Sequence, residues 1–201
     1  MKKTVGKSKG NSFEREVGRI LSLWWTEDTR DDIFYRSHSS GERFTVRKKL
    51  GKDTAFQGGD ITCSDPIGKP LIENWNIECK TGYARRTKNN LINWDVLNLI
   101  DSQQNEPILI KMWNQCKKDA ELTNREAILI FRRNRKKPCI MFSVKYMNYL
   151  FGIFGMHKTH AVIIVTPTES CVIFNIKDFF EWIPNIRLAM KIGLNTSRYS
   201  I

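Results

Sequence analysis

The runs GGDITC at residues 58–63 and WNIECKT at residues 75–81 decide the fold of this 201-residue chain. Each run is short, contains residues that favour strands and is bounded by turn residues, so each predicts a β-strand. Between them, Asp65-Pro66 and Gly68-Lys69-Pro70 predict a turn. The sequence therefore predicts two strands joined by a short connection.

The second strand places two charged side chains on one face. Side chains alternate along a strand, so Glu78 and Lys80 point the same way. Ile77 and Cys79 face the other side. If the strand of Asp60 is the antiparallel neighbour of this strand, Asp60 lies beside Glu78. Two carboxylates and an ammonium then meet at the edge of a sheet, where their burial is costly unless they pair or bind a metal.

This trio suits metal-assisted hydrolysis of phosphodiesters. Carboxylate oxygens and a few retained waters are the environment of Mg²⁺, so we expect Mg²⁺ as the cofactor, with Mn²⁺ as a substitute. The ion would polarise the scissile phosphate and activate a bound water. Lys80 would orient that water or help to deprotonate it, and Cys79 could offer the metal only its backbone carbonyl. The alternative interpretation is an exposed Glu–Lys pair on an edge strand, worth about a few tenths of a kcal/mol.

Helices and strands alternate along the rest of the chain. Residues 1–11 are basic and poor in apolar groups, which predicts a flexible arm, and a helix is expected to begin near Asn11 or Ser12 because apolar residues then recur at helical spacing. No internal repeat or domain linker interrupts the pattern, so we expect a mixed α/β fold. The other predicted elements are a strand at 33–35, a long loop or hairpin at 42–59, a helix at 107–122, a hairpin of strands at 127–131 and 139–144, a helix at 144–151, strands at 161–166 and 171–175, and a helix from residue 177.

The composition favours a polyanionic partner. Lys and Arg number 33 and Asp and Glu 21, a net charge of +12, which is typical of proteins that bind nucleic acid. The longest apolar stretches fall far short of the ~20 residues that a membrane span needs. The five cysteines are odd in number and form no CxxC pair, which argues against a zinc ribbon or a disulfide framework. We therefore expect a protein of the cytoplasm, or of the host cytoplasm if it is viral.

Asp60 followed by Glu78-x-Lys80 resembles the PD-(D/E)XK nuclease motif, with Gly59 where that family often has proline. Four segments in order resemble the archaeal-type Holliday junction resolvases: KGNSFEREV at 9–17, YRSHSSG at 35–41, GGDI at 58–61 and NIECKTG at 76–82. The resemblance covers about residues 9–82. It implies a restriction-endonuclease-like core, a mixed β-sheet flanked by helices, at residues 12–145, after the arm at 1–11. Residues 146–201 would be a C-terminal α/β extension packed on the same domain.

The resemblance also assigns roles by position. Glu14 matches the first-helix glutamate that completes a metal site with Asp60 and Glu78, and Lys80 matches the catalytic lysine. Arg36 matches an arginine that contacts the DNA backbone, and Ser40 a loop serine that some members need for cleavage. The implied activity is resolution of four-way junctions by paired nicks, carried out by a homodimer with Mg²⁺.

Glu14 has a structural alternative, because with Asn11 as N-cap it would be the glutamate of a capping box. Further DNA contacts are expected from the basic run that follows Lys80, where phosphates can be held without reading of sequence. The turn at residues 132–137 could do the same, although a role in solubility is slightly favoured. The remaining candidates for DNA binding are Lys9, Tyr83, Arg85, Arg86, Lys88 and Gln115, the last on the helix after the motif.

The chain also departs from the compact resolvases. Residues 42–58 form a longer basic insertion, and the segment after about residue 145 is extra to the minimal core. Two other functions therefore stay open: another PD-(D/E)XK nuclease of the restriction or repair type, or a DNA-binding protein with this fold and no activity.

Overall fold

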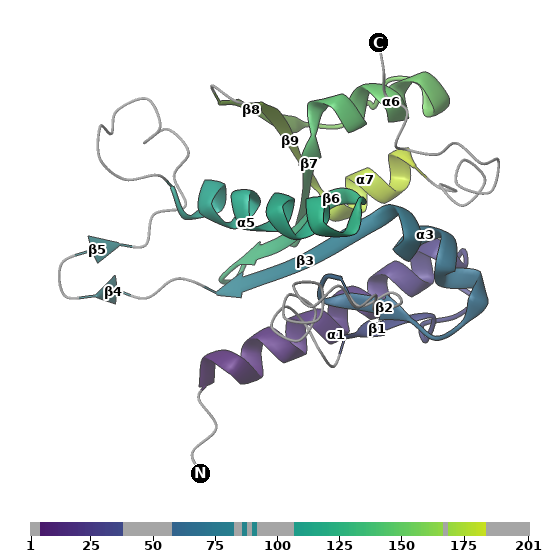
Figure 1. The fold of residues 1–201 in the computed structure, drawn as a ribbon, viewed down its shortest axis with the longest axis horizontal. Helices are drawn as coiled ribbons and strands as arrows, with labels where there is room; N and C mark the ends of the chain where they lie inside the picture. The colour runs from purple at the N-terminus through teal and green to yellow at the C-terminus, as the bar shows by residue number, and fades with distance from the viewer. Residues whose placement is uncertain are drawn as a thin grey trace.

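The computed structural model describes residues 5–37, 58–82, 86–87, 90–91, 107–166 and 169–183, with side chains described from residue 9 on except at 86–87 and 90–91. Its centre is a five-stranded sheet in the order β3-β6-β7-β9-β8 (Figure 1). The strands are β3 (Trp75–Gly82), β6 (Glu126–Arg133), β7 (Cys139–Ser143), β8 (Ala161–Val165) and β9 (Ser170–Asn175). This mixed sheet flanked by helices confirms the predicted fold class.

The sheet is mixed because only one pair of its strands is parallel. β3 runs parallel to β6, from Trp75 opposite Glu126 to Gly82 opposite Arg133, and the helix α5 (Ile108–Thr123) lies in the connection between them. The other three pairs are antiparallel, including the β6–β7 hairpin that the sequence predicts. β3 therefore stands at one edge of the sheet, with its outer side open to the segment that carries Asp60.

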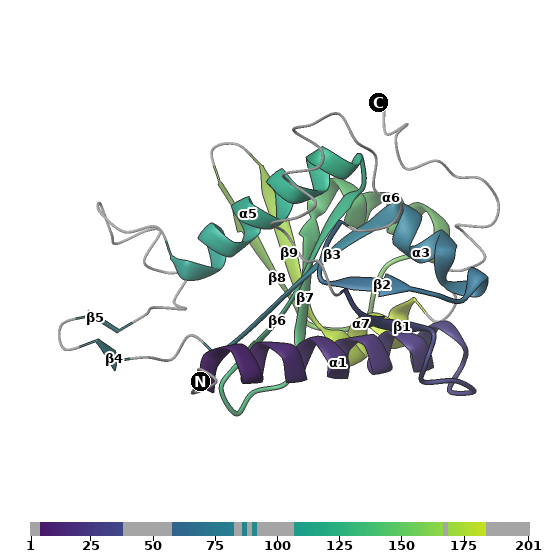
Figure 2. The ribbon, with the colours of Figure 1, turned by 60° about the horizontal axis from the view of Figure 1, so that its bottom comes forward.

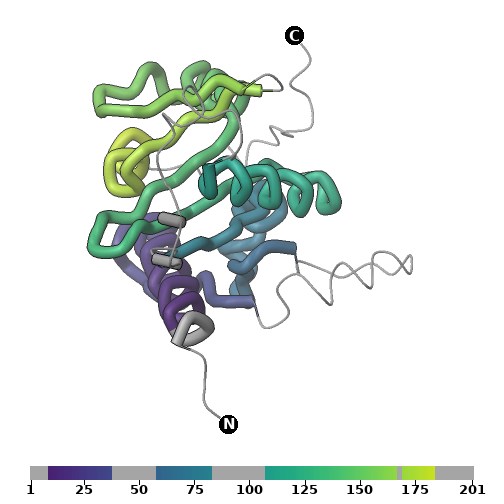
Figure 3. The backbone as a smooth tube through the Cα atoms, turned by 90° about the vertical axis from the view of Figure 1, so that its left-hand side faces the viewer, coloured from purple at the N-terminus to yellow at the C-terminus, as the bar shows by residue number. Residues whose placement is uncertain are grey.

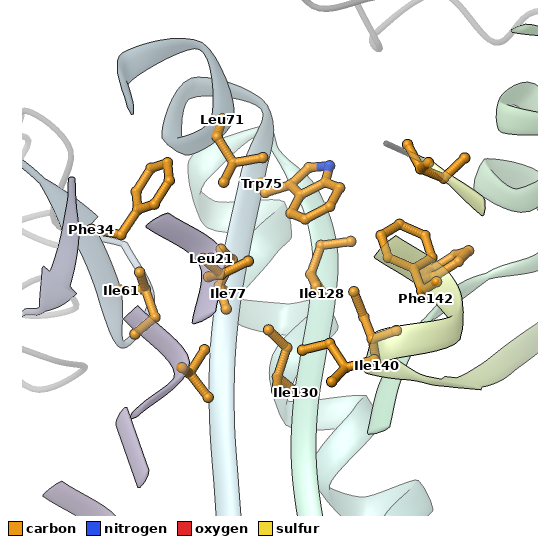
Figure 4. Packing of buried hydrophobic residues seen from close by; sticks show 14 of the residues in the cluster. Leu21, Phe34, Ile61, Leu71, Trp75, Ile77, Ile128, Ile130, Ile140 and Phe142 are labelled. Carbon is orange, nitrogen blue, oxygen red and sulfur yellow. The ribbon is translucent and has the colours of Figure 1, made fainter. Parts of the chain in front are cut away.

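Helices cover both faces of the sheet (Figures 2 and 3). Alternation along the strands separates two cores: Ile77 and Ile128 pack with α1 (Val5–Trp25) on one side, while Leu129 packs with α5 on the other. α3 (Lys69–Asn74), α6 (Val144–Phe154) and α7 (Ile176–Trp182) contribute to the first core, part of which Figure 4 shows. The C-terminal segment shares this sheet, since β9 lies between β7 and β8.

The strand after Asp60 does not pair with β3. Instead β2 (Ile61–Cys63) pairs with β1 (Phe34–Arg36) in a separate two-stranded antiparallel sheet against α1. The antiparallel ladder between the Asp60 strand and residues 75–81 is therefore wrong. Asp60 itself still reaches β3, because its backbone N–H donates to the carbonyl of Ile77 at 2.8 Å.

One other local prediction is wrong, and another is incomplete. The first helix begins at Val5, so residues 5–11 are helical where a flexible arm was expected. Once a helix has a packed segment, each further turn adds hydrogen bonds at little cost, even in a polar sequence. The turn at 65–70 is a 3₁₀ turn (Pro66–Gly68) followed by α3. Both prolines stand at the start of helical turns, where their missing N–H has no partner to lose.

The structure also places β4 (Arg86–Thr87) and β5 (Asn90–Leu91) as a short antiparallel pair. No helix in the described part of the chain is long and apolar enough to cross a lipid bilayer.

Candidate active site

A tight turn brings Asp60 to the open edge of β3. Gly59 has a φ of +85°, and a Cβ placed there would lie 2.7 Å from the carbonyl oxygen of Ile77. The backbone therefore approaches β3 more closely than any residue with a side chain permits. The proline that many PD-(D/E)XK proteins carry at this position cannot adopt such a φ. Asp60 is then fixed by three hydrogen bonds: its own N–H donates to the carbonyl of Ile77, the N–H of Cys79 donates to its Oδ2 at 2.9 Å, and the N–H of Ser37 donates to its carbonyl at 2.8 Å.

Glu78 and Lys80 lie together on the face of β3 opposite the apolar Ile77 and Cys79, as strand alternation predicts. Lys80 Nζ donates to Glu78 Oε1 at 2.5 Å. Both Asp60 and Glu78 are 7% exposed, and they are the only acidic residues buried to this extent among the described side chains. The interpretation of Glu78 and Lys80 as an exposed surface pair is therefore wrong.

Burial and neighbouring negative charges raise the pKa values of both carboxylates. Burial is the main cause that raises the pKa of Asp60 to about 7, and the negative charges of Glu78 and Glu14 add to it. The N–H of Cys79 and the ammonium of Lys80 act in the opposite direction. Burial also raises the pKa of Glu78, against the effect of Lys80. Negative charge is therefore concentrated here beyond what the neighbouring cation neutralises.

Glu14 joins this field from α1. Its carboxylate accepts a hydrogen bond from Arg36 Nε on β1, and its charge raises the pKa values of both Asp60 and Glu78. Because α1 begins at Val5, Glu14 lies inside the helix, and the capping-box interpretation with Asn11 is wrong. Gly18, one turn further on, lets β1 approach, since a Cβ there would lie 2.8 Å from the carbonyl oxygen of Phe34.

The groups at the open edge of β3 that could coordinate a metal all do so through oxygen atoms. Oxygen is the hard type of ligand that Mg²⁺ prefers. The carbonyl oxygen of Cys79 is a further possible ligand. The N–H and C=O of one strand residue point to the same side of the strand, and the N–H of Cys79 already donates to Asp60. Among the described side chains, no three from His, Cys, Asp or Glu stand close enough to form a ready-made metal site. Arg36 and Lys80 hold Glu14 and Glu78 as ion pairs.

Sequence reasoning missed Asp119, on α5. Its negative charge contributes to the raised pKa of Glu78, while its own pKa is raised by burial and lowered by the charge of Lys80. A half-buried acid therefore faces the Glu78–Lys80 pair from the helix that covers this face of β3. Gln115 lies one turn earlier on the same helix and is exposed. The four-residue spacing from Gln115 was the available signal.

Asn76 is a second residue that sequence reasoning missed. It is completely buried on the same face of β3 as Glu78, and neither its side-chain oxygen nor its nitrogen has a hydrogen-bond partner in the described structure. A Cβ on Gly58 would lie 2.9 Å from Asn76 Oδ1, so this amide lies directly beneath the turn that delivers Asp60.

The candidates for DNA contact fall in different places. Arg36 is engaged with Glu14, and Lys9 is exposed on the first half of α1. Arg86 is the first residue of β4, and only its backbone is among the described parts of the chain. Ser40, Tyr83, Arg85 and Lys88 lie outside the described residues.

Comparison with known families decides the affiliation. The model of a family described as "Phage putative PDDEXK endonuclease" matches residues 5–186. The chain belongs to this family. It is thus a member of the PD-(D/E)XK nucleases, and the match spans α1, the Asp60 turn, β3 and the C-terminal strands together. No curated protein and no solved structure gives a significant match.

Proposed function

We propose that this nuclease is a Mg²⁺-dependent DNA endonuclease that resolves four-way junctions by paired nicks, in recombination or repair. The observation that carries the proposal is the pair of buried carboxylates, Asp60 and Glu78, at an open sheet edge with Lys80 on Glu78 and the charge of Glu14 nearby. Such a charged cluster is costly to bury unless a cation or a reacting group uses it.

Three carboxylates and one carbonyl would hold the metal: Glu14, Asp60, Glu78 and Cys79. When bound, Mg²⁺ or Mn²⁺ supplies Lewis acidity toward the scissile phosphate. The protein's own part is to fix these oxygens, through the Cys79 N–H on Asp60 and the Lys80 ammonium on Glu78. Lys80 also presents a positive charge to the attacking water and to the negative charge that develops at phosphorus.

The four ordered segments between residues 9 and 82 favour a branched substrate, because together they resemble junction resolvases. The net charge of +12 favours a DNA partner. Two symmetric nicks need two active sites, and a two-fold homodimer is the simplest assembly that supplies them. The setting that fits this activity and the five free thiols is the reducing cytoplasm, of a host cell if the protein is viral.

Two alternatives keep part of this account. A restriction-type or repair nuclease would use the same site on linear DNA, and an inactive DNA-binding protein would keep only the basic surface. The buried Asp60–Glu78–Lys80 cluster favours an enzyme over a binding protein, since binding alone gives no reason to bury two acids.

Cleavage of a synthetic four-way junction and of a linear duplex with the same arm sequences tests the proposal. We expect Mg²⁺-dependent paired nicks in the junction and little cutting of the duplex. Equal cutting of both substrates would favour the restriction- or repair-type alternative. Intact strands at every Mg²⁺ and Mn²⁺ concentration, with DNA bound, would leave only the binding protein.

A further inference from the structure

A basic cavity lies on the flank of α1 away from the carboxylates. It has a volume of about 330 Å³ and is formed where the first half of α1, the end of β3 and the β6–β7 turn come together. Figure 2 shows this turn beside the first half of α1. The lining residues are Lys9, Ser12, Thr81, Arg132, Arg133, Asn134, Arg135 and Lys136.

Five of these eight residues are cations and the other three carry hydroxyl or amide groups, so none of the described lining residues is an acid. This is the composition of a site for a phosphate group. We infer that the cavity binds a backbone phosphate of duplex DNA, at a point separate from the phosphate that is cut. The inference rests on the proposed function, because it takes DNA to be the substrate.

One lining residue, Arg132, is held by contacts with α1. The Arg132 guanidinium stacks 4.6 Å from the ring centroid of Phe13 and forms an ion pair with Glu16 at 2.6 Å. Arg132 is thereby engaged in packing α1 against β6. The rim residues Arg133, Arg135 and Lys136 are exposed and form no ion pair within the described part of the chain. Lys9 is exposed as well and forms no ion pair among the described residues, so four lining cations remain to bind a ligand.

The turn that carries the rim has a fixed shape. The N–H of Lys136 donates to the carbonyl of Arg133 at 3.1 Å, and Arg135 has a φ of +59°. A residue other than glycine in this region is uncommon and marks a tight turn. The three cations are therefore presented from a compact turn, and the backbone of this turn needs little ordering when a phosphate binds.

The position of the cavity favours a duplex over a free phosphate. Lys9 and Ser12 share one flank of α1, because residues three apart lie on one side of a helix. Glu14 lies on the other flank, facing Arg36. A ligand that touches both flanks must span the helix, whose diameter is about 10–12 Å. The major groove of DNA is about 12 Å wide, so two strands can pass on either side of α1 while a single nucleotide cannot.

Salt dependence of DNA binding tests this inference. Measurements use the Asp60→Asn protein, so that binding is read without cleavage. Arg133→Gln with Arg135→Asn removes two rim charges, and asparagine tolerates the positive φ of residue 135. We expect the slope of log K against log salt to become shallower by about two, near 0.9 for each lost phosphate contact. Binding should weaken across all sequences.

Two matched variants complete the test. Lys69→Gln with Lys145→Gln removes the same charge at the opposite end of the sheet, and should leave the slope unchanged. Arg133→Lys with Arg135→Lys keeps the charges and should keep the slope. An unchanged slope in the Gln/Asn variant, or an equal change in the Lys69/Lys145 variant, would overturn the inference. A shallower slope in the Arg133→Lys, Arg135→Lys variant would likewise overturn the inference. The charges are kept in that variant, so the arginines would then affect binding by stabilising the local structure.

Cleavage by the wild-type protein is recorded separately, so the two proposals fail independently. Without cleavage, the proposed function fails while a changed slope still places DNA in the cavity. With cleavage and an unchanged slope, the enzyme stands and the cavity is excluded from the interface. In the protein that keeps Asp60, Arg133→Gln with Arg135→Asn should raise KM several-fold and leave kcat near the wild-type value.

Discussion

At the scale of single residues, the main feature of the site is that few positive or hydrogen-bonding groups stabilise the carboxylates of Asp60 and Glu78. Among the described residues, the N–H of Cys79 donates to the carboxylate of Asp60 and the ammonium of Lys80 donates to Glu78. Burial raises the pKa values of both acids, and the negative charge of Glu14 adds to this effect. Neither partner balances two carboxylates that face one edge. The residues therefore create local demand for a positive charge, which is a property of catalytic sites more than of stabilising ion pairs.

Asp60→Asn or Lys80→Ala should abolish cutting while junction affinity survives. The loss should reach at least about 10²–10³-fold, the usual effect of removing one charge-stabilising group. Asp28→Asn is the matched control, since Asp28 is exposed and its φ of 61° suits asparagine. The measurements are single-turnover cleavage and junction binding. Simultaneous loss of binding and cleavage would indicate misfolding and argue against these roles.

Glu126 gives a pH-dependent prediction away from the site. Burial raises its pKa, and Ser143 Oγ donates to its carboxylate at 3.0 Å. Since the folded state binds the proton more tightly, the stability from this group is present at low pH. It is lost as pH rises from the ordinary pKa, about 4.3, through the raised value. Glu126→Gln removes this step and keeps the acceptor oxygen.

We therefore expect the Glu126→Gln protein to unfold at a higher temperature than the wild type at pH 7, because the wild-type carboxylate is then charged and buried. The difference should shrink toward pH 4. Thermal unfolding across this range measures it, with Glu121→Gln on the exposed side of α5 as control. A difference that is constant with pH would contradict the assignment to Glu126.

At the scale of elements, β3 is the piece that gathers the site. Its position at the sheet edge leaves the backbone of Ile77 and Cys79 available to Asp60, so a turn replaces a paired strand there. The consequence is a dependence on Gly59, whose backbone lies closer to Ile77 than a Cβ allows.

Gly59→Ala should displace Asp60 and cost most of the activity. Gly82→Ala is the matched control: Gly82 has a φ of +93°, but a Cβ there meets no described atom within 4 Å. Both variants carry the left-handed strain of about 1–2 kcal/mol, and only Gly59→Ala adds the clash with β3. Cleavage rate and melting temperature compare the two. Equal effects would show that the close approach has no special role.

Most helices and strands could be predicted from the sequence, because alternation and helical spacing depend only on residues close together in the chain. Alternation placed Glu78 and Lys80 on one face, and helical spacing predicted α5 within one residue at each end. Partners distant in sequence were harder to predict. The pairing of β2 with β1 and the approach of Asp119 to Glu78 depend on how whole elements pack, which neither period nor turn chemistry encodes.

At the scale of the whole molecule, the net charge of +12 has a specific distribution. The described part of the chain concentrates basic residues around the cavity on one flank of α1, and acids at the β3 edge on the other. Repulsion keeps phosphates away from carboxylates unless a divalent cation joins them, so affinity and cutting are separable. We expect Ca²⁺ to support DNA binding with little cleavage, because its looser coordination positions the attacking water poorly.

Binding and cleavage assays in Ca²⁺ and in Mg²⁺, at equal ionic strength, measure this separation. Junction affinity should be similar in the two ions, with strand cutting confined to Mg²⁺. Rapid turnover in Ca²⁺ would argue against a site built from Asp60, Glu78 and the carbonyl of Cys79.

The proposed homodimer makes a prediction about products. If each subunit cuts one strand, mixing wild-type protein with excess Asp60→Asn protein puts most active sites beside an inactive partner. On a supercoiled plasmid that extrudes a cruciform, paired nicks give linear DNA and a single nick gives an open circle. Subunit exchange with Asp60→Asn should therefore shift the product from linear to open circle, whereas exchange with Asp28→Asn should not. Linear product that persists in the Asp60→Asn mixture would mean that one subunit makes both cuts. The paired nicks would then give no argument for a two-fold homodimer.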